Sequence, residues 1–135
     1  MNADFIKQKI QIVTIAENQL LLLQFAPERG EGFQNITGSV EEDENFLEGA
    51  RRELVEEIGV AENLLDINLH LNFRDRWGFE VEERVFLYHP DKKPEIRLSP
   101  EHCSYKWIPI QEVKESDFVY VSNFLAFKKA MEFCR

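Results

Sequence analysis

Long apolar segments are absent from this sequence of 135 residues. The longest uninterrupted apolar runs span four residues, such as Leu20 to Leu23, whereas a membrane-spanning helix needs about 20. The first residues, Met1 to Phe5, show no basic stretch followed by an apolar core. The sequence therefore predicts neither a membrane span nor a secretory signal.

Cysteine is also scarce. Cys103 and Cys134 are the two cysteines of the chain, too few for a disulfide scaffold or for a cysteine-ligated zinc site. We therefore expect a protein of the reducing cytoplasm, and we expect Cys103 to be a small core residue.

Positive charge is in deficit. The chain has 16 Lys and Arg against 25 Asp and Glu, which gives a formal net charge of −9. Such a protein repels nucleic-acid phosphates, so stable binding to a duplex is not expected. A small phosphorylated ligand is compatible with this charge where a metal mediates, because clustered carboxylates bind Mg²⁺ and Mg²⁺ binds phosphates.

The remaining composition, 44% hydrophobic and 30% charged, is that of a folded protein. No linker or repeat interrupts it, so we predict one domain over residues 1–135. Its patterns predict strands over 11–16, 20–25, 33–37, 64–73, 79–88, 95–98 and 104–108, helices over 44–58 and 121–133, and a loop over 27–32. Hairpin neighbours mixed with helical crossovers indicate an α/β (α+β) fold, a mixed β-sheet with helices packed on its faces.

The predicted helix over 44–58 has the clearest pattern. Its apolar positions are Leu47, Ala50, Leu54 and Ile58, and Gly59 stands where a C-cap is expected. The buried side of this helix is therefore defined by the sequence.

The same helix carries clustered acid. Glu53, Glu56 and Glu57 have i, i+3 and i+4 spacing, which places them on one face beside the apolar stripe. Like charges at this spacing repel each other. One interpretation is a solvated acidic face with Arg51 and Arg52 as ion-pair partners, and the other is a site for divalent cations.

A glycine turn favours the second interpretation. Gly38-Ser39-Val40 precedes an acidic run, residues 41–44, that leads into the helix. Glycine turns bring backbone close to phosphates, and divalent cations bridge carboxylates to phosphate oxygens.

These residues resemble a known family. The segment from Gly38 to Val60 reads G-x5-E-x7-R-E-L-V-E-E-I-G-V, which is similar to the whole signature of the Nudix hydrolases. Seven fixed positions match by chance with a frequency on the order of 10⁻⁸ per starting point. The resemblance implies a Nudix-like fold, a mixed sheet sandwiched between helices, and an enzyme that hydrolyses diphosphate linkages.

A second resemblance concerns fewer residues. The segments Thr37 to Glu42 and Glu101 to Trp107 are similar to those of bacterial dihydroneopterin triphosphate pyrophosphatases of the folate pathway. Phe25 departs from that branch, which carries an arginine there, so a guanidinium that would pair with a phosphate is lacking.

The resemblance also implies roles for individual residues. Mg²⁺, or Mn²⁺ in its place, would be the cofactor, and the general base is either Glu53 or Glu101. Arg52 would orient a helix carboxylate, and Glu44 would support the start of the helix. The implied metal ligands are Glu53, Glu56, Glu57, Glu101 and the carbonyl of Gly38.

Substrate contacts are predicted at four further positions: Thr37, Lys9, Arg76 and Trp77. The alternative for the two cations is a solvated surface charge, and for the tryptophan it is packing in the core. Of the adjacent Glu82 and Glu83, one is expected to face the metal site, because side chains alternate along a strand. No catalytic role is predicted for His102, and Trp107, Phe124 and Phe127 are read as core.

The predicted function is a Mg²⁺-dependent pyrophosphohydrolase that converts dihydroneopterin triphosphate to the monophosphate and pyrophosphate. One alternative is a pyrophosphohydrolase of (deoxy)nucleoside triphosphates or dinucleoside polyphosphates. A second is a ligand-sensing Nudix domain without catalysis, and the third is a structural protein with an acidic helix. The partner is a small phosphorylated substrate, without a membrane, and a homodimer is a candidate oligomeric state.

Overall fold

The computed structural model describes residues 5–26 and 32–134. Apart from Gly32, the predicted loop over 27–32 lies outside the described residues. The strands are β1 (Ile6–Ala16), β2 (Gln19–Phe25), β3 (Phe33–Gln34), β4 (Ile36–Ser39), β5 (Leu65–Arg74), β6 (Glu80–Tyr88) and β7 (His102–Pro109). The helices are α1 (Phe46–Ile58) and α2 (Val121–Ala130), with short 3₁₀ turns at Ile110–Glu112, Glu115–Asp117 and Met131–Phe133.

One seven-stranded sheet has the order β3-β2-β1-β6-β5, with β4 also paired to β1 and β7 to β2. β1 runs parallel to β6, and the other pairs are antiparallel. The predicted mixed sheet is confirmed. The length of β1 matters for the site, because Lys9 stands opposite Ser39 of β4 on one side and Glu83 of β6 on the other.

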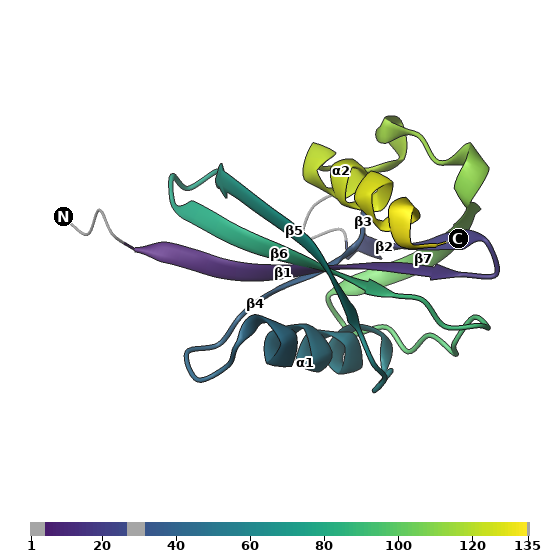
Figure 1. Cartoon of the computed structure of the whole chain (residues 1–135), viewed down its shortest axis with the longest axis horizontal. Helices are drawn as coiled ribbons and strands as arrows, with labels where there is room; N and C mark the ends of the chain where they lie inside the picture. Colours follow the sequence, from purple (N-terminus) through teal and green to yellow (C-terminus); the bar gives the residue numbers. More distant parts are fainter. Residues whose placement is uncertain (1–4, 27–31, 135) are drawn as a thin grey trace.

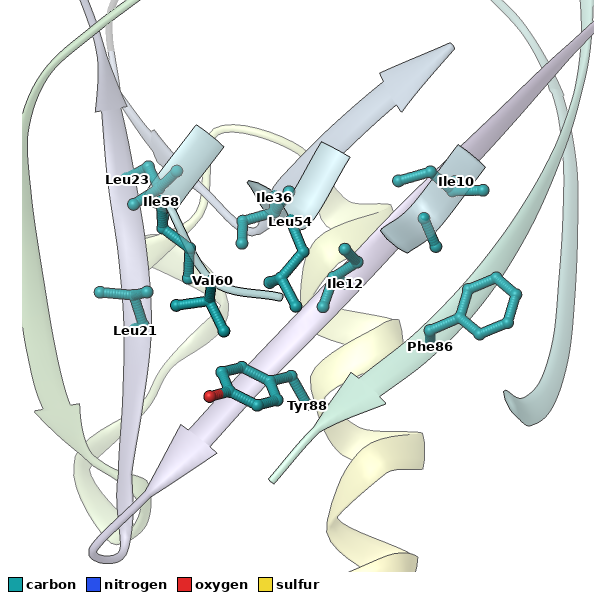
Figure 2. Packing of buried hydrophobic residues seen from close by; sticks show 11 residues of the cluster. Ile10, Ile12, Leu21, Leu23, Ile36, Leu54, Ile58, Val60, Phe86 and Tyr88 are labelled. Carbon is teal, nitrogen blue, oxygen red and sulfur yellow. The ribbon is translucent and has the colours of Figure 1, made fainter. Parts of the chain in front are cut away.

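The two helices cover opposite faces of the sheet, as Figure 1 shows with α1 below and α2 above the strands. Alternation along β1 supplies both cores. Ile10 and Ile12 pack with Leu54 and Ile58 of α1 (Figure 2), while the odd-numbered Val13 belongs to the cluster under α2. Side chains of opposite parity on one strand therefore face different helices.

Local signals set the bounds of α1. Asn45 is the N-cap: its side chain accepts from the Glu48 backbone N–H at 2.8 Å, and the Glu48 carboxylate accepts from the Asn45 N–H at 2.9 Å. This reciprocal capping box starts the helix at Phe46, two residues after the predicted position. Its predicted end is correct, since Gly59 takes a left-handed φ of 77° as C-cap.

The predicted strand over 95–98 is wrong. Residues 95–98 belong to no strand of the sheet. The backbone here donates hydrogen bonds to the last turn of α1 instead. The Arg97 N–H donates to the Ile58 carbonyl at 3.0 Å and the Ser99 N–H to the Glu57 carbonyl at 3.2 Å. Carbonyls in the last turn of a helix lack partners within it, and this chain segment satisfies two of them.

Three smaller predictions also change. The strand over 33–37 is interrupted at Asn35 into β3 and β4. The prediction that Cys103 is a core residue is wrong, because it is exposed and its thiol donates to the Phe25 carbonyl. Phe127 is buried as predicted, whereas Trp107 and Phe124 are partly buried at the edges of the two cores.

Within the part of the chain that the structure describes, no helix has the length and apolar character needed to cross a membrane.

Candidate active site

The predicted glycine turn is wrong, because Gly38 and Ser39 belong to β4 and pair with β1. Close packing joins this strand to the acidic helix. Gly38 lies directly against the side chain of Glu53 from α1, so that a Cβ at this position would overlap the Glu53 carboxylate. Only glycine fits without a shift of that side chain, and Gly38 therefore fixes where the Glu53 carboxylate lies.

Arg52 holds the acidic face together. Its guanidinium donates to Glu44 at 2.7 Å, to Glu53 at 3.0 Å and to Glu56 at 3.1 Å. It also donates to the Ser39 carbonyl at 2.8 Å, which connects the helix to the end of β4. The Arg52 hydrogen bond holds the pKa of Glu44 below its usual range. Both predicted supporting residues, Glu44 and Arg52, thus belong to one network.

Glu57 has a different environment. Its carboxylate is buried and lies 2.8 Å from Nδ1 of His102, and the Ser99 hydroxyl donates to it at 3.1 Å. The His102 ring stacks on Phe25, with centroids 5.5 Å apart and planes at 10°. Phe25, where the related branch has arginine, thus packs against the histidine that contacts Glu57.

The helix geometry explains why the acids separate. At ~100° per residue, Glu57 lies about 60° from the buried Leu54 and Glu56 about 160° from it. Glu53 and Glu57 are accordingly buried, while the Glu56 side chain is 51% exposed. The three acids share one side of the helix, as predicted, but only Glu53 and Glu57 are buried there.

A cavity of about 300 Å³ opens over these two carboxylates. Its further lining comes from β1, β2, β3, β4 and the residues at the start of β7. The lining residues are Lys9, Phe25, Gln34, Thr37, Gly38, Ser39, Glu53, Glu57, Glu101 and His102. We call this space the acidic cavity.

A second cavity of about 310 Å³ adjoins it and shares Lys9 and Thr37. It lies on the α2 face of the sheet, at the start of that helix. Its remaining lining residues are Phe73, Arg74, Asp75, Arg76, Trp77, Glu83, Tyr120, Ser122 and Asn123. Three of these are aromatic, and we call it the aromatic cavity.

Burial raises the pKa of Glu53 to about 7; the Arg52 hydrogen bond opposes this rise and the charge of Glu57 adds to it. Two buried carboxylates this close together disfavour each other's charge. A cation placed between them would remove that penalty.

Comparison with known proteins decides the family. The family sequence model of the NUDIX domain matches residues 8–124 of this chain. The chain belongs to the NUDIX family. This bears out the predicted class of enzyme, a hydrolase that acts on phosphoanhydride bonds.

Solved structures with the NUDIX fold superpose closely on this chain. The E. coli dihydroneopterin triphosphate pyrophosphohydrolase is 24% identical with a TM-score of 0.80, covering 90% of this chain and 92% of that one. An Ap4A hydrolase from C. elegans is 20% identical with a TM-score of 0.79, covering 95% and 97%. At these identities the likeness concerns the fold.

A curated relative is more similar in sequence but much longer. An octanoyltransferase from Myxococcus xanthus is 32% identical over an alignment of 102 residues that covers 73% of this chain. The match spans only 29% of that protein.

NUDIX hydrolases generally use a divalent metal ion, and the residues of the acidic cavity fit one by their chemistry. Glu53, Glu57 and Glu101 offer carboxylate oxygens, and Gly38 lines the same space; hard oxygen donors suit Mg²⁺. In residues 5–26 and 32–134, however, no three His, Cys, Asp or Glu side chains are grouped as a preformed metal cage. Glu56, the remaining predicted ligand, is engaged by Arg52 outside the cavity.

The structure brings most predicted residues together. Gly38, Glu53, Glu57 and Glu101 line the acidic cavity. The predicted substrate contacts line the aromatic cavity: Lys9, Thr37, Arg76 and Trp77. Of the pair on β6, Glu83 is the one that points inward, but it lines the aromatic cavity instead of the acidic one.

No site role is predicted for several residues that line the cavities. His102, for which no catalytic role is predicted, contacts Glu57 from β7. Gln34 on β3 lines the acidic cavity, and Tyr120 and Asn123 line the aromatic one. None of these residues belongs to a motif, because their places follow from strand pairing and from the docking of α2.

Proposed function

We propose that this NUDIX hydrolase is a Mg²⁺-dependent pyrophosphohydrolase of small organic triphosphates, with dihydroneopterin triphosphate as the first candidate substrate. One observation carries the proposal: a cavity lined by buried carboxylates adjoins a cavity with aromatic walls, and Lys9 and Thr37 line both. A triphosphate attached to a flat ring needs these two environments side by side.

Residues of the acidic cavity would hold the metal. Glu53, Glu57, Glu101 and the Gly38 carbonyl are its candidate ligands, with Glu56 joining if Arg52 releases it. These residues would hold Mg²⁺ in the acidic cavity, where it would supply positive charge to the phosphate oxygens and to the attacking water. Lys9, at the boundary of the two cavities, adds a fixed positive charge beside the triphosphate.

The chemical step transfers one proton. The oxygen of water bonds to a phosphorus of the α–β linkage, and the bond from that phosphorus to the bridging oxygen breaks. The bridging oxygen leaves with the other fragment, so the products are the organic monophosphate and pyrophosphate. A carboxylate takes the proton from water: Glu53 or Glu101, whichever binds metal less tightly, since metal binding makes a carboxylate a poor base.

Dihydroneopterin triphosphate is favoured by the segments Thr37–Glu42 and Glu101–Trp107 and by the aromatic cavity. Phe25 removes one phosphate partner of that branch. Arg74 and Arg76 supply positive charge in the adjoining aromatic cavity instead. Nucleoside triphosphates and dinucleoside polyphosphates are the competing substrates.

Acyl transfer, named for the M. xanthus relative, is not proposed for this chain, because the match spans only 29% of that protein. The shared segment is better explained as a NUDIX domain carried within a longer protein.

The test is incubation with dihydroneopterin triphosphate, each nucleoside triphosphate or Ap4A, with and without Mg²⁺, and chromatography of the products. Release of pyrophosphate from a triphosphate supports the proposal, and release of inorganic phosphate alone contradicts it. Glu57→Gln should slow turnover at least ~10²-fold. Glu82→Gln, a matched change on β6 outside both cavities, should leave it unchanged. Normal turnover in Glu57→Gln would remove Glu57 from the mechanism, whereas binding of these compounds without turnover by the wild-type protein would favour a ligand-sensing domain.

Glu101→Gln distinguishes the two candidate bases. If Glu101 takes the proton, the variant loses turnover while its affinity for Mg²⁺, measured by calorimetry, changes little. Equal losses in both would make Glu101 a ligand and leave Glu53 as the base. Cytoplasmic location and a homodimer complete the proposal, and sedimentation of the purified protein tests the second.

A further inference from the structure

A buried carboxylate with no part in the hydrolysis forms the floor of the aromatic cavity. Glu83 on β6 is 3% exposed, yet it lines that cavity. Its Oε1 accepts from the Gln11 side chain at 2.9 Å. A charged group buried to this extent is costly unless donors surround it.

A chain of buried amides fixes the orientation of Glu83. Gln11 directs its amide nitrogen to Glu83, because its oxygen accepts from the Asn35 side chain at 2.7 Å. Asn35 is in turn held by Asn123 of α2, whose side-chain oxygen accepts from the Asn35 N–H at 2.7 Å. Glu83 is therefore presented to the cavity as a fixed hydrogen-bond acceptor.

The protein only partly satisfies this acceptor. An ionised carboxylate has about four acceptor positions, and among residues 5–26 and 32–134 one hydrogen bond to Glu83 is recorded, from Gln11. Burial raises the pKa of Glu83, and the nearby charge of Lys9 opposes that rise. A ligand that brings two N–H donors would complete the carboxylate's hydrogen bonds.

The walls of the cavity suit a flat ring. Phe73, Trp77 and Tyr120 line it and are each at least 39% exposed. Aromatic faces of this kind stack on heterocycles. The donor groups would then lie in the plane of the stacked ring, directed at the floor.

We propose that Glu83 selects a heterocycle with two adjacent N–H donors, the ring N–H and exocyclic amino group of a 2-amino-4-oxo ring. Guanine and pterins share this edge, so the substrate class becomes triphosphates of 2-amino-6-oxopurines or 2-amino-4-oxopteridines. The inference rests on the proposed function and names the ring that the same enzyme recognises. Adenine and cytosine present a ring-nitrogen acceptor beside the amino group, which a fixed carboxylate repels.

A single amino group tests the idea. GTP and ITP differ only by the exocyclic 2-amino group, so the ratio of their kcat/KM values reports its recognition. We expect the wild-type protein to prefer GTP by about 10- to 100-fold, the range for a hydrogen bond to a charged group. Glu83→Gln should bring the ratio close to 1, and the control Glu82→Gln should keep the wild-type ratio.

A wild-type ratio near 1, or an unchanged ratio in Glu83→Gln, would overturn the role of Glu83. The ratio of kcat/KM for GTP and ITP in the wild-type protein is measured without any variant. It therefore tests recognition of the amino group even if Glu83→Gln folds poorly. Binding of GMP and IMP by calorimetry separates this inference from the proposed function. If no triphosphate is hydrolysed, the proposed function fails. Tighter binding of GMP that is lost in Glu83→Gln would still support the ring site, and equal affinities would refute it.

Discussion

Replacement of Gly38 by alanine tests the central contact of the site, the packing of Gly38 on β4 against the side chain of Glu53. The added methyl group would overlap Cγ, Cδ and Oε2 of Glu53, so either that side chain or β4 must move. Steric overlap of this kind in a packed region costs about 1–3 kcal/mol. For a chain of this length each kcal/mol lowers the melting temperature by about 3–5 °C, so we expect a fall of roughly 3–15 °C.

The proper assay is a double-mutant cycle. Glu53→Ala removes all three overlapping atoms, so Gly38→Ala should cost less than about 0.5 kcal/mol in that background. Chemical denaturation of the four proteins gives the coupling free energy directly. In the wild-type background Gly38→Ala should also lower turnover by about 10²-fold, because it displaces a carboxylate of the reaction centre.

An equal loss of stability in both backgrounds would refute this reasoning. It would mean that alanine at position 38 disturbs β4 itself and that Glu53 is not the obstacle. The role given to Gly38, which is to fix the position of the Glu53 carboxylate, would then be wrong.

Three other perturbations have defined outcomes. Leu54→Ala empties a fully buried position and should cost about 2–5 kcal/mol in urea denaturation, whereas Val55→Ala on the exposed side should cost less than about 0.5 kcal/mol. Mg²⁺ at 100 times its Kd should stabilise the wild-type protein by about 2.7 kcal/mol in thermal melts, and Glu57→Gln should lose this gain. The pKa of Glu83 is raised in the folded state, so its folded form keeps a proton that the unfolded chain releases near pH 4.3; native stability is then lost as pH rises through the folded pKa. Glu83→Gln should therefore gain stability relative to wild type as the pH rises from the unfolded pKa of a glutamate, about 4.3, through the raised folded pKa, and a pH-independent difference in melting temperature would contradict this.

Local features of α1 were predictable because they depend on neighbours in the sequence. The apolar stripe of Leu54 and Ile58 and the C-cap at Gly59 were all found in the expected places. Its predicted start at residue 44 is two residues early. Asn45 and Glu48 have the spacing of a capping box, so the sequence already carries the signal that begins the helix at Phe46.

Contacts between distant segments were not predictable in the same way. The segment over 95–98 has a strand-like composition, yet it pairs with the last carbonyls of α1 and not with the sheet. His102 contacts Glu57 only because β7 lies against β2 and delivers its first residue beside the helix. Neither fact has a periodic signature, since each depends on where a strand docks.

The sequence by itself determined the family and the acidic helix, because their signature lies within one continuous stretch from Gly38 to Val60, whereas the turn predicted at Gly38 is part of β4. Only the tertiary structure decided which acids work together. The docking of α1 buried Glu53 and Glu57 and left Glu56 exposed with Arg52. The parallel pairing of β1 with β6 set Lys9 opposite Glu83, so that one lysine borders both cavities. Side chains far apart in the chain meet only when strands pair in register, and that register is a property of the whole fold.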